Sequence, residues 1–304
     1  MKTLLIGADG QLGRYLRQAL AGRGELTCCT RQGRDGDLAC DLTDLPALTR
    51  VLTDVAPALI VNAAAYTAVD KAEAEPGLAA LLNADVVRVI GEWAATAGSA
   101  VIHYSTDYVF DGTATRPYRE SDTPTPANAY GASKLAGEVA LARSAADHLI
   151  LRTAWVYSRT GRNFLTTMLR LASTMPRLRV VADQIGSPTS APDIAQITAQ
   201  IAARWMSGSL QERGALSGVY HLTAQGSTSW HGFAEAIVAQ AHAAGLLSLA
   251  PPVDAITTAQ YPTPATRPAY SVLDTSKLAA TFDIQAPTWQ RGLHDVLATV
   301  TDPS

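Results

Sequence analysis

The first half of this chain alternates short apolar runs with segments whose apolar residues recur at helical spacing. Strands separated by helices in this rhythm form a parallel sheet with helices on both faces. We therefore expect a doubly wound, Rossmann-type α/β fold, which binds ligands at the carboxyl ends of its strands. The expected strands are 3–6, 25–30, 38–40, 58–61, 100–104 and 148–151, and the expected helices include 45–55, 76–97 and 129–144.

After Arg152 the alternation weakens, because nine prolines interrupt the second half of the chain between Pro176 and Pro287. Helical patterns remain at 163–173, 191–206 and 230–244, and residues 219–223 are typical of a strand. We expect residues 1–155 to form a dinucleotide-binding domain and residues 156–304 a smaller, mixed α/β substrate-binding lobe. The boundary is soft, and some C-terminal segments are expected to return to the first domain.

Charge and cysteine content exclude several classes of protein. The net charge is −3, and no basic tract is present, which argues against a nucleic-acid-binding protein. The three cysteines, Cys28, Cys29 and Cys40, suit neither a disulfide framework nor a zinc site, so we interpret them as buried apolar residues. No apolar run reaches the roughly 20 residues of a membrane span, and the N-terminal run is too short for a signal peptide. We therefore expect a cytoplasmic protein without a membrane partner.

A glycine-rich turn follows the first expected strand. Gly7, Gly10 and Gly13 have the spacing G-x-x-G-x-x-G and precede a helical pattern. Glycines at such a position permit a tight turn, close approach of the backbone to a pyrophosphate, and close packing of helix on strand. The helix N-terminus would then supply N–H donors to the phosphates. The alternative is a turn that needs glycine for its geometry alone.

Other residues near strand ends suit a nicotinamide dinucleotide. Arg31 follows the second strand, where an acidic residue commonly binds the adenosine ribose, and an arginine there favours a 2′-phosphate. We therefore expect NADPH, with NADH as the alternative, and a solvated loop arginine as the other interpretation of Arg31. Asp41 is placed to meet the adenine edge. The small residues Ala63, Ala64 and Ala65 offer room for the ribose on the nicotinamide side.

A tyrosine–lysine pair suggests the chemistry. Tyr130 and Lys134 are four residues apart at the start of an expected helix, so they share one helix face. A nearby cation favours the phenolate and would lower the pKa of Tyr130, which suits proton donation to a carbonyl during hydride transfer. Either Thr106 or Ser105, at the end of the fifth strand, can supply a hydroxyl that orients the carbonyl.

Several longer segments resemble the extended short-chain dehydrogenase/reductase family, and within it the dTDP-4-dehydrorhamnose reductases, over nearly the whole chain. Two of these segments, Val-Asp-Lys-Ala-Glu at 69–73 and Asp-Gln-Ile-Gly-Ser-Pro-Thr at 183–189, are specific to that branch. The other matching segments are 7–13, 61–68, 103–112, 130–138, 152–157 and 261–268. The resemblance implies NADPH-dependent reduction of the 4-keto group of dTDP-4-dehydro-6-deoxy-L-mannose, a dTDP-deoxysugar, to dTDP-L-rhamnose.

The resemblance also implies roles for single residues. It makes Tyr130 the proton donor, Thr106 the partner of the carbonyl, and Lys134 a ligand of the ribose hydroxyls that lowers the tyrosine pKa. The cofactor-binding set further includes Gln11, Leu12 and Leu42. The implied substrate-binding residues are Asp107, Trp155, Asn163 and Arg267. Each has a structural alternative: Trp155 as core, Asn163 as a helix cap, and Arg267 as a surface ion pair.

One departure concerns metal. Some members of this family dimerise around a magnesium ion held by surface glutamates, but the matching positions here are Tyr15 and Asp295. Without those carboxylates an oxygen-ligand site is hard to build, so we expect no metal, and a monomer or a metal-independent dimer. Two other functions are weighed: 4-ketoreduction of a different dTDP-deoxyhexose, and a non-catalytic, NADP-binding regulatory subunit. The presence of Thr106, Tyr130 and Lys134 argues against the second.

Overall fold

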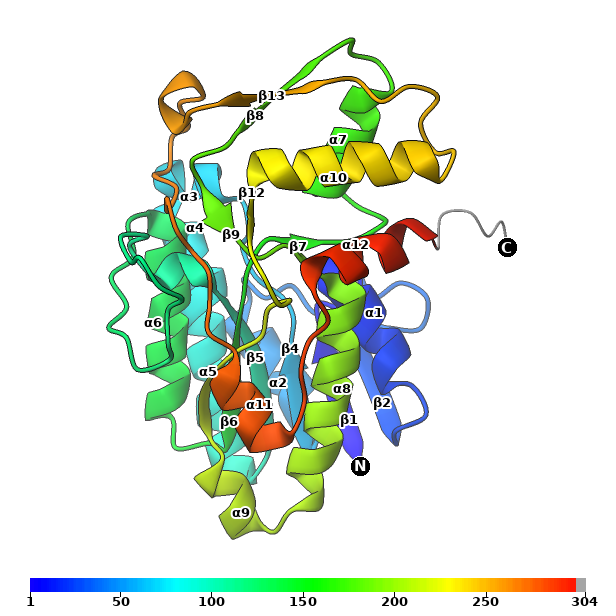
Figure 1. The fold of residues 1–304 in the computed structure, drawn as a ribbon. Helices are drawn as coiled ribbons and strands as arrows, with labels where there is room; N and C mark the ends of the chain where they lie inside the picture. Colours follow the sequence, from blue (N-terminus) through cyan, green and yellow to red (C-terminus); the bar gives the residue numbers. More distant parts are fainter. Residues whose placement is uncertain (299–304) are drawn as a thin grey trace.

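The computed structural model describes residues 1–298, and its centre is a seven-stranded parallel sheet (Figure 1). The strand order is β11-β6-β5-β4-β1-β2-β3. The bounds are β1 (Lys2–Ile6), β2 (Glu25–Thr30), β3 (Leu38–Ala39), β4 (Leu59–Asn62), β5 (Ala100–Thr106), β6 (His148–Thr153) and β11 (Gly218–His221). The order reverses between β1 and β4, and doubly wound sheets bind ligands at such a reversal, outside the carboxyl ends of the strands.

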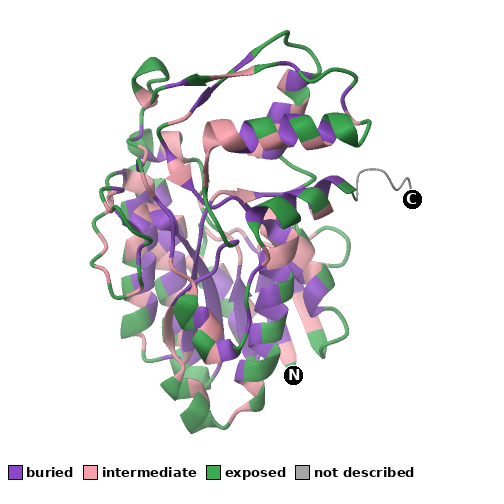
Figure 2. Ribbon diagram, in the orientation of Figure 1, coloured by how far each residue is buried: buried purple, intermediate pink, exposed green. Residues whose placement is uncertain are grey.

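Helices cover both faces of the sheet, so that its strands form a buried layer (Figure 2). One face carries α1 (Gln11–Leu20), α8 (Ala191–Ser207) and α11 (Ser276–Phe282). The other carries α2 (Leu45–Val55), α5 (Val86–Ala97) and α6 (Ala129–Arg143). The doubly wound fold expected from the alternating sequence is therefore confirmed.

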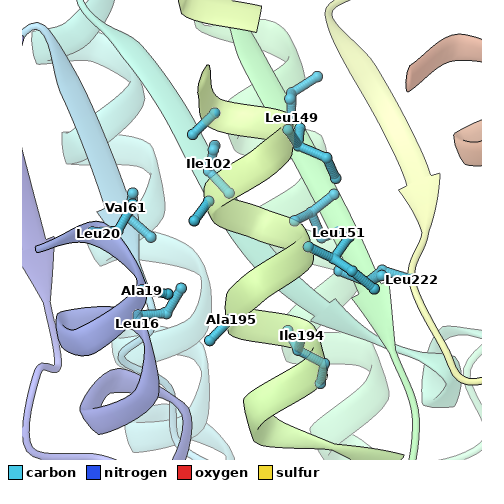
Figure 3. Packing of buried hydrophobic residues seen from close by; sticks show 14 of the residues in the cluster. Leu16, Ala19, Leu20, Val61, Ile102, Leu149, Leu151, Ile194, Ala195 and Leu222 are labelled. Atoms are coloured by element: carbon cyan, nitrogen blue, oxygen red, sulfur yellow. The ribbon is translucent and has the colours of Figure 1, made fainter. Parts of the chain in front are cut away.

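The apolar runs of the strands explain this double burial. Successive residues of a strand point to opposite faces, so a sheet covered on both sides needs continuous apolar runs. In β5, Ile102 packs in the cluster that contains Leu16 and Ile194 (Figure 3), whereas its neighbour Val101 packs in the opposite cluster with Leu48.

A smaller layer lies beyond the carboxyl edge of the sheet, in the upper part of Figure 1. Its core joins three helices and two strands through buried residues that include Tyr157, Phe233 and Leu293. The elements are β7 (Val156–Tyr157), α7 (Phe164–Ala172), β8 (Leu178–Val181), β9 (Ile185–Gly186), β10 (Thr189–Ser190), β12 (Thr228–Ser229), α10 (Trp230–Ala243), β13 (Val253–Ile256), η3 (Thr258–Gln260) and α12 (Trp289–Ala298). The remaining elements are α3 (Val69–Ala74), α4 (Pro76–Ala80), η1 (Leu81–Asp85), η2 (Asp107–Val109) and α9 (Leu210–Ala215).

Parts of the second half of the chain belong to the sheet. The strand expected at 219–223 is β11, which pairs in parallel with β6, and α8 packs against α1. Residues after 155 therefore supply the seventh strand and two of its covering helices. The substrate-binding lobe that we propose consists of the remaining C-terminal segments.

The long helix expected at 76–97 contains a π-helical turn, η1, between α4 and α5. In this turn the buried side chain of Asn83 accepts a hydrogen bond from the Tyr66 N–H (2.8 Å) and donates to the Tyr66 carbonyl (3.0 Å) and to Ser133 Oγ (2.9 Å). The widened turn thus joins this helix both to the loop after β4 and to α6. Apolar periodicity could not show it, because η1 keeps the helix continuous.

A buried ion pair joins α6 to the sheet. Arg152 on β6 donates to both oxygens of Glu138, through Nε (2.9 Å) and Nη2 (2.6 Å), and the side chains are only 3% and 5% exposed. The Arg152 guanidinium also lies over the Phe110 ring, and its Nη1 is 3.5 Å from His221 Nε2. A forked, two-bond geometry of this kind compensates for removing both charges from water.

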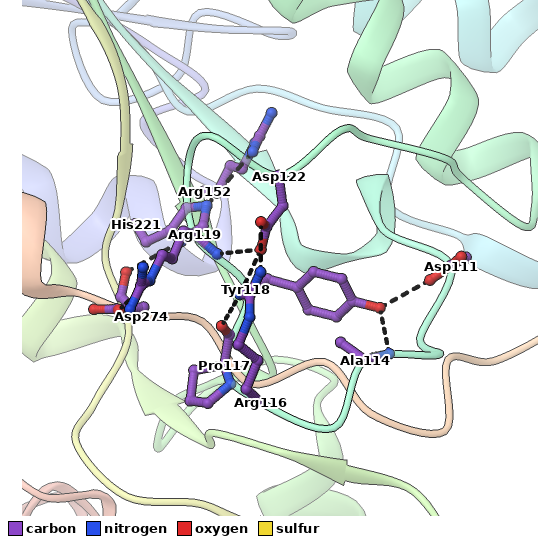
Figure 4. Close-up of polar contacts among 10 residues, drawn as sticks. All are labelled: Asp111, Ala114, Arg116, Pro117, Tyr118, Arg119, Asp122, Arg152, His221 and Asp274. Atoms are coloured by element: carbon purple, nitrogen blue, oxygen red, sulfur yellow. Dashed lines mark hydrogen bonds and ion pairs between the residues drawn. The ribbon is translucent and has the colours of Figure 1, made fainter.

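Hydrogen bonds and an ion pair join the loop before α6 to the C-terminal segment, beside Arg152 (Figure 4). The Tyr118 N–H donates to the Val272 carbonyl (2.9 Å), and the Asp274 N–H donates back to the Tyr118 carbonyl (2.7 Å). Arg119 pairs with the Asp274 carboxylate at 3.4 Å. These contacts bring residues near 270 to the carboxyl edge of the sheet.

We predict that Arg152→Met lowers the free energy of unfolding by about 3–5 kcal/mol, because Glu138 is left buried without its partner. Urea denaturation of the native and variant proteins measures the loss. Arg88→Met is the matched control, since Arg88 pairs with Glu92 on the surface of α5 and its loss should cost about 0.3–0.5 kcal/mol. Equal losses in the two variants would show that the buried pair does not stabilise the fold.

Candidate active site

A cleft of about 760 Å³ lies at the carboxyl edge of the sheet, below the upper layer. Residues from β1, β2, β5 and α6 line it, together with the segments that follow β4 and β6. Arg267 is the one predicted site residue outside its lining. The predicted residues in the lining are Gly7, Gly10, Gln11, Leu12, Arg31, Asp41, Leu42, Ala63, Ala64, Ala65, Thr106, Asp107, Tyr130, Lys134, Trp155 and Asn163.

The glycine-rich turn forms one end of the cleft. Gly7 has a φ of +80°, and a Cβ there would lie only 2.8 Å from the Ala64 backbone nitrogen. A Cβ at Gly13 would lie 2.9 Å from Ala8 Cα, so the helix packs against the turn without a side chain between them. Gly10 is the N-cap of α1, and no side chain caps the helix. Its first N–H groups are therefore available to an anion.

The ends of β2 and β3 form the neighbouring wall. Arg31, whose side chain is 76% exposed, pairs with Asp41 (Nη2 to Oδ2, 3.0 Å). Asp41 also accepts hydrogen bonds from the backbone and hydroxyl of Thr43, and these bonds together with Arg31 lower the pKa of its carboxyl group. The two residues assigned separately to a 2′-phosphate and an adenine edge thus form one charged pair at the mouth of the cleft.

Tyr130 and Thr106 meet inside the cleft. Asn128 caps α6 by accepting a hydrogen bond from the Gly131 N–H (2.8 Å), which places Tyr130 in the first turn. Tyr130 lies beside Thr106 at the end of β5, whose hydroxyl favours the phenolate, and its ring meets that of Tyr108 edge-on at 5.9 Å. Ser105, the other candidate hydroxyl, has no hydrogen-bond partner for Oγ. Of the two, Thr106 is the one that acts on the pKa of the tyrosine.

The expected lowering of the tyrosine pKa is wrong for this structure. Burial instead raises the pKa of Tyr130 to about 12, although the neighbouring Thr106 hydroxyl acts in the opposite direction. Burial also lowers the pKa of Lys134 to about 8, and Lys134 Nζ lies 3.2 Å from His103 Nε2. The four-residue spacing places both residues on one helix face but does not determine where the lysine side chain points.

His103 is a residue of the site that sequence reasoning missed. Its Nδ1 lies 3.2 Å from Asn62 Nδ2, and Asn62 Oδ1 accepts a hydrogen bond from the Ala64 N–H (3.2 Å). Asn62, His103 and Lys134 are each buried, so this chain of contacts joins the lysine to the small-residue loop after β4. His103 begins the matching segment 103–112, but neither the residues nor the resemblance assigned it a role.

Two polar atoms near the tyrosine have no protein partner. Asp107 is 2% exposed, and its Oδ2 is unpaired while Oδ1 accepts from Thr106 (3.0 Å). Burial raises the pKa of Asp107 to about 6. Arg267 pairs through Nη2 with Asp70 (2.8 Å) and lies over the Tyr108 ring, but its Nη1 is buried and unpaired. Unpaired buried polar groups are costly, and at a cleft they indicate a polar ligand.

Aromatic rings line the side of the cleft formed after β6. Trp155 stacks on Trp230, with ring centroids 3.5 Å apart and planes 3° from parallel. No sequence pattern singled out Trp230, which begins α10. Asn163 caps α7 by accepting from the Thr166 N–H (3.1 Å), so the structural alternative for this residue is present although it also lines the cleft.

Within residues 1–298, no group of three or more His, Cys, Asp or Glu side chains could hold a metal ion. Tyr15 lies on α1, and Asp295 on α12 is paired with Arg291 at 2.8 Å. The three cysteines are buried and free, as expected. In the same part of the chain, no helix is both long and apolar enough to span a membrane.

Comparison with known proteins places this geometry in a family. A family model described as the RmlD substrate binding domain matches residues 1–302. dTDP-4-dehydrorhamnose reductase from Burkholderia thailandensis is 46% identical over 295 residues, which are 95% of this chain and 96% of that protein. The reductase from Salmonella typhimurium is 42% identical over 98% of this chain and 97% of that protein. The crystal structure of dTDP-4-dehydrorhamnose reductase from Bacillus anthracis in complex with NADP superposes with a TM-score of 0.87 at 32% identity, covering 98% of this chain and all of that one.

We predict that Asp107 makes stability depend on pH. Its raised pKa means that the folded protein favours the protonated carboxyl group, so the stabilisation is present below pH 4 and is lost as the pH rises through about 6. The asparagine of Asp107→Asn cannot ionise, so the variant does not lose this stabilisation. The free energy of unfolding of the variant minus that of the native protein should therefore increase by about 3 kcal/mol from pH 4 to above pH 6. Urea denaturation at a series of pH values measures the difference. A difference that does not change with pH would contradict the assignment.

Proposed function

Because this chain belongs to the family of dTDP-4-dehydrorhamnose reductases, we propose that it reduces the 4-keto group of dTDP-4-dehydro-6-deoxy-L-mannose to give dTDP-L-rhamnose. It is an NAD(P)-dependent oxidoreductase. The observation that carries the proposal is that Thr106, Tyr130 and Lys134 line one cleft together with the glycine-rich turn at its end.

The residues of the cleft fit a nicotinamide dinucleotide phosphate. The uncapped N-terminus of α1 and the close packing of Gly7 and Gly13 leave backbone N–H groups free for a pyrophosphate. Arg31 at the mouth of the cleft suits the additional 2′-phosphate of NADPH, because a guanidinium binds phosphate through paired hydrogen bonds. The loop of small residues, Ala63 to Ala65, lies where β4 ends and leaves space near Tyr130 and Lys134.

The proposed reaction needs one hydride and one proton. A nicotinamide held in the cleft would supply the hydride for C4. Tyr130 keeps its proton at neutral pH, because its pKa is raised to about 12, and donates it to the carbonyl oxygen as that oxygen gains negative charge. This proton transfer is energetically favourable because an alkoxide is more basic than a phenolate. Thr106 orients the carbonyl and favours the phenolate that remains, and Lys134 binds ribose hydroxyls of the cofactor.

The proposed sugar nucleotide has matching partners in the cleft and, at Arg267, beside it. The unpaired Nη1 of Arg267 suits the diphosphate, because a guanidinium donates in a fork that fits phosphate oxygens. The unpaired Oδ2 of Asp107 can accept a hydrogen bond from a sugar hydroxyl. Trp155 offers an apolar surface, and Asn163 at the start of α7 lies at the edge of the same cleft.

The direct test measures the oxidation of NADPH by the purified protein with dTDP-4-dehydro-6-deoxy-L-mannose, which the upstream dehydratase and epimerase generate in the assay. We expect rapid oxidation and identification of dTDP-L-rhamnose as the product. Turnover of a different dTDP-ketosugar only would overturn the substrate assignment. Binding of NADPH without turnover of any ketosugar would overturn the enzymatic proposal and favour a regulatory subunit.

We predict that Tyr130→Phe lowers kcat by about 100-fold or more, which is the scale for losing a general acid. The dissociation constant of NADPH, measured by fluorescence titration, should stay close to that of the native protein. Tyr66→Phe is the control, because Tyr66 is hydrogen-bonded to Glu75 outside the catalytic pair. A Tyr130→Phe variant with native kcat would rule out Tyr130 as the proton donor.

We predict that Arg31→Ala weakens the binding of NADPH by about tenfold, the loss of roughly 1.4 kcal/mol, while NADH binding changes little. The reason is that only NADPH carries the phosphate that the guanidinium would contact. Titration of the native protein and the variant with each cofactor gives the ratio of the dissociation constants for NADPH and NADH. An equal loss for NADPH and NADH would contradict a contact with the 2′-phosphate.

A further inference from the structure

The segment Asp183–Thr189 has no role in the reaction proposed above, although its sequence is among the most specific in the chain. Asp183, the first residue of the segment, accepts hydrogen bonds from the Thr258 N–H (2.9 and 3.0 Å) and from the Thr258 hydroxyl (2.7 Å). Ser187 Oγ donates to the Gly226 carbonyl (2.7 Å) near its end. The segment is thus held at both ends, beside the cleft.

This segment is connected to both tryptophans of the cleft. Through β9 it pairs with β12, where Gly186 is opposite Thr228, two residues before Trp230. Through β10 it pairs with β7, and the Thr189 N–H donates to the Trp155 carbonyl (3.3 Å). The same short stretch of chain therefore fixes the backbone on each side of the stacked rings.

Trp155 has an unusual backbone conformation. Its φ is +48°, in the left-handed region that a bulky residue rarely adopts, and such strain persists only where the surroundings determine it. One face of the indole is covered by Trp230 at 3.5 Å, and Phe164 packs on Trp230 in turn at 4.6 Å. Both tryptophans line the cleft and are half-buried, so part of the stack faces the ligand space.

Gly186 lies against the edge of the same indole. A Cβ at this position would come within 2.5 Å of Trp155 Nε1 and 2.7 Å of Cζ2, distances that real Cβ atoms do not reach. The backbone of Gly186 is not in the left-handed region, so its φ does not require glycine. The contact with Trp155 is what excludes a side chain here.

We infer that Gly186 and Trp230 are positioning residues that hold the Trp155 indole as an apolar wall for the deoxygenated face of the substrate sugar. The inference rests on the proposed function, because a 6-deoxyhexose presents a methyl group and C–H bonds where other hexoses carry a hydroxyl. An indole packs on such a surface through dispersion and removes it from water. The branch-specific segment thus determines which sugars fit, although it contributes no reacting group.

The wall also has a fixed relation to the phosphate-binding turn. Gln11 in the first turn of α1 donates through Nε2 to the carbonyl of Val156, the residue after Trp155 (2.9 Å). Displacing Trp155 should therefore change how the sugar binds more than how the proton is transferred, because Tyr130 and Thr106 are held by α6 and β5.

The test compares Gly186→Ala, Trp155→Phe and the double variant in steady-state kinetics. Gly186→Ala should raise the KM for the ketosugar by about tenfold, with kcat within about threefold and NADPH affinity unchanged. Phenylalanine at 155 lacks the indole atoms that the new methyl group would meet. The double variant should therefore have nearly the KM of Trp155→Phe alone, a non-additivity that marks direct coupling. Gly208→Ala is the control, because a Cβ there meets atoms only at 3.5 Å or more.

Circular dichroism gives a second readout that needs no turnover. Two indoles stacked at 3.5 Å couple their transitions, and the signal of this pair is the difference between the native protein and Trp230→Phe. Gly186→Ala should lose that signal, and Gly208→Ala should keep it. Additive KM effects, or a Gly186→Ala variant with the native signal, would overturn the inference. A native enzyme that turns over no ketosugar would refute the proposed function instead, while the spectra still decide whether Gly186 positions Trp155.

Discussion

The buried ion pair between Arg152 and Glu138 is the contact on which the active-site geometry depends. Glu138 lies one turn after Lys134 on α6, and Arg152 lies on β6, so the pair fixes the helix that carries Tyr130 against the strand next to β5. Both charges are removed from water, and the two parallel hydrogen bonds between them compensate for that cost. A shift of α6 along the sheet would separate Tyr130 from Thr106. Misplacement of a catalytic group by about 1 Å can cost two orders of magnitude in rate.

Burial controls the electrostatics of the cleft in more than one direction. It raises the pKa values of Tyr130 and Asp107 and lowers that of Lys134, because in each case the charged form is disfavoured. Glu138 acts against burial at Lys134, so the ion pair that positions α6 also supports the charge of the lysine. At neutral pH Tyr130 therefore keeps its proton until the carbonyl oxygen needs it.

Long-range contacts bring distant parts of the chain together around the cleft. Asp70 on α3 binds Arg267, nearly two hundred residues later, and Tyr118 pairs with the segment around Val272. The Trp155–Trp230 stack joins the ends of β7 and α10 in the same way. The cofactor end of the cleft is built from the first half of the chain, whereas the proposed sugar end needs side chains from both halves.

The sequence by itself determined the sheet, its covering helices and the positions of most cleft residues, because these follow from local periodicity and from the rule that parallel strands end at one edge. Gly7, Thr106 and Tyr130 could be placed together from their positions at strand and helix ends alone. Only the tertiary structure decided that β11 joins this sheet, that Lys134 turns toward His103, and that Gly186 lies on Trp155. Such contacts join residues that are far apart in the sequence, and no local propensity or spacing encodes which side chains will meet when the chain packs.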